Sequence, residues 1–338
     1  MNRQFTQHPI HQMDMRRKWS YTWRGIRNPA MYHGQYQQRR YFEGWYYKLV
    51  DPAGERPLAV IPGMAFDEAG ESHAFIQVMD GAAHQAAYHR FDAAEFEASD
   101  REFRVRIGSN RFGPEGLQLD LPDLQGEIRL SGLQPWPWRP WAPGIMGWYA
   151  YVPFMQCYHG VVSLTHRLDG ELRRGGAAWS YTGGKGYLEK DWGRSFPSSW
   201  VWMQSNHFEE PALSLTASVA KIPWLGSSFT GFIAGLWWKG QLYRFTTYTG
   251  ARLTQLGVEG QDVRLTFRDL RYRLEIEAQQ APGAELRSPV QGLMQGRVNE
   301  SLQARIGIRL YEGSRLLLSG TGLHAGLEVA GSVEELQP

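Results

Sequence analysis

The feature that most constrains the fold of this chain is a succession of short strand-like runs with almost no helical periodicity between them. Runs such as LAVIPGMAF, HAFIQVMD and FRVRIGSNRFG are rich in strand-favouring residues and end at Gly, Pro, Asp or Asn. The pieces QLDL and EIRL alternate strictly, as in strands with one face in water. Thirty-eight glycines and a 13% aromatic content suit tight turns and wide side chains that fill a barrel or line a cavity. We therefore predict an all-β protein of two antiparallel β-barrels, or half-open barrels, side by side.

Changes in composition divide the chain. Residues 1–35 are polar and irregular and are predicted to form an N-terminal arm or lid. Residues 134–154 combine five prolines with four tryptophans, a density of proline that excludes helix and central strand. They are predicted to be a crossing connection whose indoles plug or cover a barrel. The first barrel domain is predicted over residues 36–175, including that connection, and the second over residues 176–338.

Charge and cysteine content exclude several classes of function. The 36 Lys and Arg residues nearly balance the 34 Asp and Glu residues and are scattered, so we expect no nucleic-acid partner. Cys157 is the only cysteine, which rules out an internal disulfide and a cysteine-rich zinc site, and no histidine spacing indicates a metal. No apolar run reaches signal-peptide or membrane-spanning length. These features predict a soluble, cytoplasmic protein without a metal.

The run YFEGWYYK offers a first candidate for ligand binding. Strand alternation places Glu43 and Trp45 on one face. An acid flanked by aromatic rings on the inner face of a barrel can bind the polar head of a ligand. The alternative is a barrel-closing aromatic strand in which Glu43 bonds the backbone or an arginine.

The run KGYLEKDWG aligns two carboxylates. Tyr187, Glu189 and Asp191 share one face of the predicted strand. Two carboxylates so close repel when both are ionised, so one has a raised pKa or is held by a cation. A pair that shares a proton is a candidate acid catalyst. The alternative is two surface carboxylates near Lys185 and Lys190.

The run WVWMQSNHF grades from indoles to amides along one face, which carries Trp200, Trp202, Gln204 and Asn206. Such a face suits the wall of a cavity that holds a ligand with a polar ring and an apolar tail. Core packing alone explains the indoles, but it does not explain two amides in register with them.

Four stretches together resemble the tocopherol cyclase family, which shares its fold with carotenoid 1,2-hydratases and lipocalin-like pericyclases. They are RRYFEGWYYKLVD, GIMGWYAYVPFMQCYHGVVSLTH, GKGYLEKDWGRSFPSSWVWMQSNHF and AGLEVAG, spanning residues 36 to about 331. The resemblance implies two lipocalin-like (calycin-type) antiparallel β-barrel domains side by side. It also implies cofactor-independent acid catalysis, in which a carboxylic acid protonates an alkene of a prenylated quinol or other isoprenoid lipid. An intramolecular hydroxyl then captures the cation.

Carried onto the EKDWG motif, the resemblance makes Asp191 the first candidate for the acid and Glu189 the second. A dry aromatic pocket keeps a carboxyl neutral near pH 7, and indole faces stabilise a cation by about 1–2 kcal/mol each when desolvated. Trp192 belongs to the motif, but alternation turns it away from Asp191. Glu328 also lies in a matched stretch and is given only an anchoring or pocket-edge role.

The strand faces and the resemblance together give a set of candidate substrate-binding residues. They are Glu43, Trp45, Tyr187, Trp192, Trp200, Trp202, Gln204 and Asn206. By the resemblance, Trp192, Trp200 and Trp202 form the wall, the two amides hold the ring oxygens, and Glu43 has a pocket-edge or anchoring role. Three alternatives stay open: a non-catalytic carrier of a hydrophobic ligand, a hydratase, and a pericyclase that only folds a polyene into a reactive shape. The expected partner is a hydrophobic small molecule, with no cofactor and at most transient contact with a membrane surface. The sequence leaves the substrate and the oligomeric state open.

Overall fold

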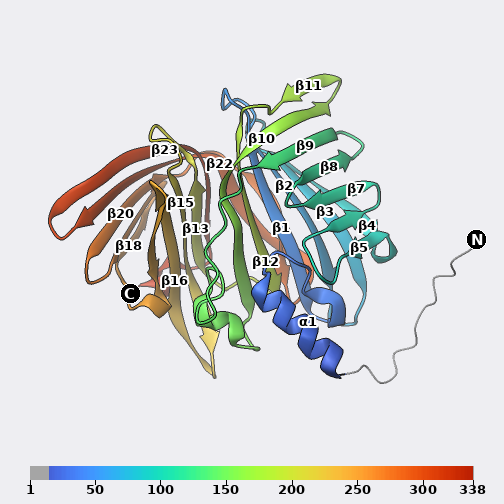
Figure 1. Ribbon diagram of the computed structural model, residues 1–338, viewed down its shortest axis with the longest axis horizontal. Coiled ribbons are helices and arrows are strands. Elements are labelled where there is room, and N and C mark those ends of the chain that lie inside the picture. The colour runs from blue at the N-terminus through green and yellow to red at the C-terminus, as the bar shows by residue number, and fades with distance from the viewer. Residues whose placement is uncertain (1–14, 338) are drawn as a thin grey trace, which may run out of the picture.

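The computed structural model describes residues 15–337 and contains two large antiparallel sheets (Figure 1). The strands of the first sheet, in chain order, are β1 (Tyr41–Val50), β2 (Leu58–Phe66), β3 (Ser72–Asp80), β4 (Gln85–Asp92), β5 (Phe96–Ala98), β6 (Val105–Ile107), β7 (Asn110–Gly113), β8 (Gly116–Asp120), β9 (Gln125–Ser131), β10 (Cys157–Arg174), β11 (Ala177–Ser180) and β12 (Lys185–Gly193). Their spatial order is β4-β3-β2-β1-β12-β10-β9-β8-β7-β6-β5, with β11 paired to β10.

The second sheet follows in the chain. Its strands are β13 (Trp200–Ser205), β14 (His207–Phe208), β15 (Ser214–Trp224), β16 (Ser227–Trp238), β17 (Gln241–Thr246), β18 (Arg252–Glu259), β19 (Asp262–Arg268), β20 (Tyr272–Gln279), β21 (Ala284–Val290), β22 (Leu293–Glu312) and β23 (Arg315–Ala330). The order is β17-β16-β15-β13-β23-β22-β20-β19-β18, with β14 on β23 and β21 on β22. The end strands of each order are not paired with each other, so neither sheet closes by hydrogen bonds. The all-β prediction of two side-by-side lipocalin-like units is confirmed in this half-open form.

The helical elements are few. They are α1 (Met15–Arg27) and the 3-10 turns η1 (Gly34–Tyr36), η2 (Ala93–Glu95), η3 (Gly147–Tyr151), η4 (Thr247–Thr249) and η5 (Val333–Leu336). Part of the predicted arm is therefore helical and not irregular. Helix α1 can form because residues 15–24 contain neither Pro nor Gly, and it packs on the protein through Tyr21 and Gly25, which are one turn apart and buried. Residues 1–14 of that arm lie outside the described residues. No helix within residues 15–337 is long and apolar enough to cross a membrane.

The chain passes from the first sheet to the second later than the sequence predicted. Strand β12 pairs with β1 on one side and β10 on the other, which makes it a central strand of the first sheet. The change to the second sheet comes between Gly193 and Trp200, so the boundary predicted between residues 175 and 176 is too early. Sequence spacing could not show this, because β12 follows a short hairpin strand and its partner β1 lies more than a hundred residues away.

Each sheet encloses its own apolar core. Trp45 and Tyr47 belong to the first core, and Val201 and Met203 to the second. A third cluster, here called the inter-sheet layer, fills the space between the sheets with side chains from both, including Tyr46, Tyr187, Trp136 and Trp202. Central strands such as β1 are therefore buried on both faces. One face packs on the strand's own core and the other on the opposite sheet.

Candidate active site

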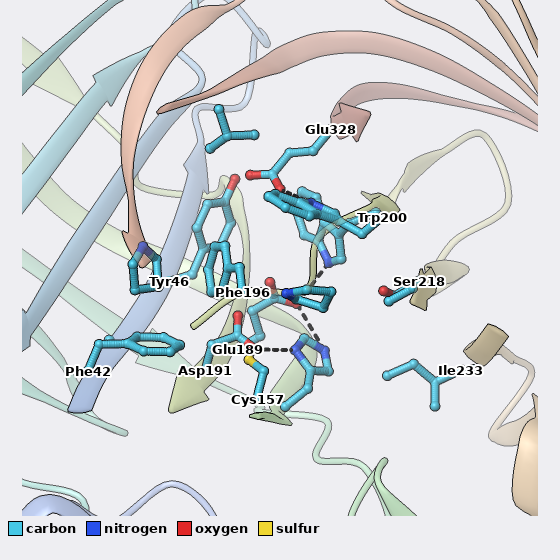
Figure 2. Close-up of a pocket in the computed structure, with 18 of the residues that line it drawn as sticks. Phe42, Tyr46, Cys157, Glu189, Asp191, Phe196, Trp200, Ser218, Ile233 and Glu328 are labelled. Carbon is cyan, nitrogen blue, oxygen red and sulfur yellow. Dashed lines mark hydrogen bonds and ion pairs between the residues drawn. The ribbon is translucent and has the colours of Figure 1, made fainter. Parts of the chain in front are cut away.

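A cavity of about 190 Å³ lies between the two sheets, beside the inter-sheet layer. Its lining is mainly apolar, with Phe42, Ile61 and Phe75 from the first sheet and Trp200, Phe232 and Ile233 from the second. Figure 2 shows the carboxylates of Glu189, Asp191 and Glu328 among these side chains. The expectation of a site on the inner face of one barrel is wrong. Alternation predicts which residues share a face, but it does not decide whether that face meets the strand's own core or the other sheet.

Glu189, Asp191 and His159 form one cluster in the cavity wall. His159 lies on β10 directly opposite Asp191 of β12 in the strand register. Its Nδ1 is 2.9 Å from Asp191 Oδ1 and its Nε2 is 3.5 Å from Glu189 Oε2 (Figure 2). The imidazole thus lies between the two carboxyl groups that the sequence placed on one face.

The charges of this cluster depend on one another. Burial by itself lowers the pKa of His159, but Asp191 and Glu189 outweigh it and raise that pKa to about 9. Burial raises the pKa of Glu189 to about 7, although His159 acts in the opposite direction. Near neutral pH an imidazolium therefore holds the carboxylate pair. The surface alternative, with Lys185 and Lys190 as partners, does not apply because Glu189 is only 4% exposed.

Glu189 also joins the two sheets. The hydroxyl of Tyr187 donates to Glu189 Oε2 at 2.5 Å, and the indole Nε1 of Trp202, from the second sheet, donates to the same oxygen at 3.3 Å. Gly326 makes room for this indole, since a Cβ at that position would lie 2.7 Å from the Trp202 ring. The carboxylate face of β12 and the indole face of β13 therefore meet across one layer.

A second carboxyl pair lies on the other wall. Glu300 of β22 and Glu328 of β23 lie directly opposite each other in the strand register. The hydroxyl of Tyr46 donates to Glu300 Oε1, and Trp200 Nε1 donates to Glu328 Oε2 at 2.8 Å. Burial raises the pKa of Glu328 to about 7 and that of Glu300 well above its usual range. Burial and the neighbouring Glu328 both disfavour the ionised form of Glu300, so the pair holds at least one proton.

The raised pKa of Glu328 predicts a pH-dependent contribution to stability. The folded chain keeps a proton on Glu328 up to about pH 7, whereas the unfolded chain releases it near pH 4.5. The contribution is thus complete below pH 4.5 and lost as the pH rises through 7. This loss is absent in Glu328→Gln. Between pH 4.5 and 8 we therefore expect the free energy of unfolding of the variant to rise relative to the native chain by roughly 3 kcal/mol. Urea unfolding at several pH values measures this, with the exposed Glu209→Gln as the control that leaves the profile unchanged.

A buried lysine stands behind the carboxyl groups. Lys48 Nζ is 2.8 Å from Gln204 Oε1. Burial lowers the pKa of Lys48 to about 7, although Glu300 and Glu189 both act to raise it. Gln204 therefore binds a side chain of the first sheet, and Asn206 Nδ2 donates to the backbone oxygen of Gly186 at 2.7 Å. Neither amide lines the cavity, in contrast to the predicted contact with ring oxygens. Both lie deeper, where they tie the sheets together.

Three other predicted binding residues point away from the cavity. Glu43, Trp45 and Trp192 lie on the first-core side of their strands, where they surround Lys190. The ammonium is 2.5 Å from Glu43 Oε1 and lies 4.8 Å and 4.7 Å from the ring centroids of Trp45 and Trp192. Glu43 also accepts from the backbone N–H of His33 at 2.9 Å. This arrangement resembles the alternative in which Glu43 bonds the backbone or an arginine of a barrel-closing strand, except that the cation is a lysine.

Of the predicted site residues, Glu189, Asp191, Trp200 and Trp202 do line the cavity, and Tyr187 stands behind Glu189 as its hydrogen-bond donor. Sequence reasoning missed three groups, namely Tyr46, His159 and Glu300, and it gave Glu328 only an anchoring or pocket-edge role. Glu328 left one signal, because it is the single charged residue in the apolar stretch AGLEVAG. No feature of the sequence marks His159, because it reaches Asp191 only through the pairing of β10 with β12.

His159, Glu189 and Asp191 are also the residues most suited to hold a metal. Among residues 15–337, they form the one group of three or more His, Cys, Asp or Glu side chains whose donor atoms all lie within 4.8 Å of one another. Hydrogen bonds from His159, Tyr187 and Trp202 already account for how these carboxylates are held. That the chain needs no metal stays a prediction.

The fold and the cavity define a lipocalin-like protein of two β domains with an acid-lined site between them. A family model described as tocopherol cyclase-like matches residues 129–331, more than half of the chain, so the chain belongs to that family. The maize (Zea mays) protein named tocopherol cyclase, chloroplastic, is 28% identical over 198 residues, a match spanning 55% of this chain and 41% of that protein. A rice (Oryza sativa subsp. japonica) protein named "Probable tocopherol cyclase, chloroplastic" is 25% identical over 381 aligned positions, covering 91% of this chain and 79% of the rice protein.

Solved structures support the fold alone. An AttH-type protein from Nitrosomonas europaea superposes with a TM-score of 0.51 at 15% identity, covering 86% of this chain and 92% of that one. CghA in complex with Sch210972 superposes with a TM-score of 0.53 at 11% identity, covering 86% and 89%. Both resemblances extend over the two sheets, so the pairing of two β domains belongs to the fold as a whole.

Proposed function

We propose that this chain is a cofactor-independent acid catalyst of the tocopherol cyclase type, acting on an isoprenoid lipid or a prenylated phenol. The observation that carries the proposal is the pair of buried Glu300 and half-buried Glu328, which keeps a proton near neutral pH beside an apolar cavity with indole walls. Membership of the tocopherol cyclase-like family supports a cyclase-type reaction. The substrate class follows from the apolar lining, which favours a hydrocarbon chain with few polar groups.

The proposed reaction is an isomerisation. The carboxylic acid transfers its proton to the less substituted carbon of a trisubstituted alkene, and the other alkene carbon becomes a tertiary cation. A lone pair of the substrate's own hydroxyl oxygen forms the new C–O bond. The hydroxyl proton then leaves and restores the acid, so no redox partner is required and the atoms of substrate and product are the same.

Glu328 is assigned as the acid in preference to Asp191 and Glu189. Asp191 Oδ1 is 2.9 Å from His159 Nδ1 and is placed as the counter-ion of an imidazolium. Glu189 accepts from Tyr187 and Trp202, and both bonds favour its ionised form. The Glu300–Glu328 pair holds a proton because burial raises the pKa of both groups and the charge of Glu328 raises that of Glu300 further. The carboxyl oxygens of Asp191 and Glu189 on the opposite wall then face the developing cation.

The indole of Trp200 is proposed to stabilise the cation. Trp200→Leu should lower kcat about tenfold, which is the effect of removing one desolvated cation–π contact of about 1–2 kcal/mol. Trp200→Phe retains an aromatic face and should lose less, while Trp179→Leu, on β11 and outside the cavity lining, serves as the control. Steady-state kinetics of the three variants measure this. Equal losses for Leu and Phe would show that the indole only bonds Glu328.

The proposal is tested by the fate of the proton. The protein is incubated in D2O with a prenylated hydroquinone, and the product is analysed by mass spectrometry and NMR. Protonation from a solvent-exchanged carboxyl predicts a cyclic product one mass unit heavier, with deuterium on the carbon next to the new tertiary ether carbon. The same incubation without protein sets the background.

The alternatives predict different products. A hydratase adds the elements of water and gives an open-chain alcohol. A pericyclase gives a rearranged product without deuterium, and its rate is insensitive to Glu328→Gln. A carrier returns unchanged lipid from native extraction and converts no quinol between pH 5 and 8. Each of these results overturns the proposed cyclisation.

A further inference from the structure

An exposed aromatic surface lies at the end of the molecule where α1, the crossing segment 134–156 and the turn between β15 and β16 come together (Figure 1). The rings of Trp23 and Tyr151 are 6.1 Å apart, and Trp138 Nε1 donates to the backbone oxygen of Ile26 at 3.0 Å. Trp224, beside the turn, contacts the crossing segment through its ring contacts with Trp148 and Phe154. We call this surface the aromatic face and define it by its exposed side chains Trp19, Trp23, Trp141, Trp148, Phe154 and Leu225.

The exposure of these side chains is large for apolar residues. Trp19 is 66% exposed, Trp141 69% and Leu225 77%. Scattered apolar residues on a surface need no explanation, but several indoles gathered from three separate chain segments mark an interaction site. Tryptophan is the residue that gains most at a boundary between water and lipid, because its ring is apolar while its N–H still bonds to water.

Helix α1 has the pattern of a helix that lies on a membrane surface. Met15, Trp19 and Trp23 are spaced four residues apart, so they form one stripe, and all three are exposed. Tyr21 and Gly25 face the protein and are buried. An apolar stripe that points outward, away from the helix's own packing face, is typical of interfacial helices.

The charge of the aromatic face has a single sign. Residues 15–27 and 134–156 contain six of the 36 Lys and Arg residues of the chain and none of its 34 Asp and Glu residues. The chain as a whole is nearly neutral, so this concentration is local. One of the six, Arg24, is partly committed to Asp100 at 3.6 Å. The excess of positive charge complements a surface of anionic lipid headgroups.

The aromatic face is continuous with the cavity. Tyr149 and Met155 line the cavity, and they are direct chain neighbours of Trp148 and Phe154. From the turn side, Phe229 lines the cavity and contacts Trp224. A surface that touched this face would therefore lie next to the entrance for an apolar substrate.

We propose that the aromatic face docks on the surface of an anionic lipid bilayer and that the cavity takes its substrate from there. The docking stands on the exposed indoles, the outward stripe of α1 and the one-signed charge. The transfer of substrate rests on the proposed function as well. The indoles insert at the headgroup level, the basic residues pair with the headgroups, and an isoprenoid lipid enters without crossing water.

The test is sedimentation of the full chain with vesicles. Binding is measured to phosphatidylcholine vesicles with and without 30% phosphatidylglycerol, at low and at high salt. We expect binding to the anionic vesicles that weakens with salt. The variant Trp19→Ser/Trp141→Ser/Leu225→Asn should lose about tenfold or more in partitioning, because it removes the most exposed apolar area of the face. Leu270→Ser, in the turn between β19 and β20 outside this face, replaces an even more exposed side chain and is the control that should bind as the native chain does.

The outcomes separate this inference from the proposed reaction. Unchanged vesicle binding by the triple variant, or no binding by the native chain, overturns the docking. A native chain that sediments as a dimer, with a monomeric triple variant, would assign the face to a second copy of the chain instead. Vesicle binding is measured without turnover, and Glu328→Gln should bind vesicles as the native chain does. The binding result can therefore be interpreted even if the chain does not catalyse the cyclisation. Thermal unfolding of the triple variant checks that it is folded, and quenching of native tryptophan fluorescence by brominated lipid tests insertion without any substitution.

Discussion

Replacement of Glu328 by Gln is expected to lower kcat by about two to four powers of ten, the usual contribution of a general acid. The amide fits the same space and still accepts from Trp200 Nε1, which now lies 2.8 Å from the carboxylate oxygen. It cannot transfer a proton to an alkene. Because the apolar lining is unchanged, KM should stay within a few-fold of the native value. Turnover of a prenylated hydroquinone by liquid chromatography measures both constants, with exposed Glu209→Gln as the control.

The same assignment predicts the pH dependence of the native chain. The acid must be protonated, and burial raises the pKa of Glu328 to about 7. Turnover should therefore be high below pH 7 and fall tenfold per unit above it. A parallel series with Asp191→Asn separates the candidates. If Asp191→Asn is inactive while Glu328→Gln works normally, the acid is Asp191 and our assignment is wrong.

The second large effect concerns stability. Lys190→Met is expected to lower the free energy of unfolding by about 3–5 kcal/mol, because it leaves the Glu43 carboxylate buried without its cation. Lys190 and Glu43 are both fully buried, and burial lowers the pKa of Lys190 only to about 8. The ammonium is therefore charged at neutral pH. Urea unfolding measures the loss, and Lys185→Met, at the start of the same strand, is the control.

Lys190 also fastens the chain that follows α1. Its ammonium donates to the backbone oxygens of Pro29 and Met31 and lies 2.6 Å from His33 Nδ1. Limited proteolysis of Lys190→Met should therefore cleave near residues 28–36 faster than in the native chain. The double variant Glu43→Leu/Lys190→Met removes both charges and should recover part of the stability. A loss below 1 kcal/mol for Lys190→Met alone would mean that water reaches the pair.

Much of the fold followed from local pattern. Alternating runs closed by turn residues predicted an all-β chain, and the proline-rich segment 134–154 forms no named strand in the described structure. Helix α1 was missed because its exposed apolar stripe does not follow the pattern of a helix packed on a core. The sheet boundary was missed because pairing between β1 and β12 joins residues far apart in sequence, and no local signal encodes such a partner.

The candidate site shows the same division. Alternation correctly placed Glu189 with Asp191 and turned Trp192 to the opposite face, which the structure shows in the first core. It could not decide which face of β1 meets the cavity, so Glu43 and Trp45 were predicted in place of Tyr46. The partners of the carboxyl groups, His159 and Glu300, come from strands that pair with theirs only in the folded sheets.

The sequence by itself determined the strands, the residues that share a face and the family resemblance, because these depend on period-two alternation and on local motifs. Only the tertiary structure decided that the two sheets pack on each other through their outer faces. That packing buries Glu189 and Glu300, leaves Glu328 half-buried, and brings the Trp202 indole of the second sheet against the Glu189 carboxyl group of the first. A carboxyl group has a raised pKa only where its surroundings exclude water, and those surroundings are assembled from residues that are distant in the chain.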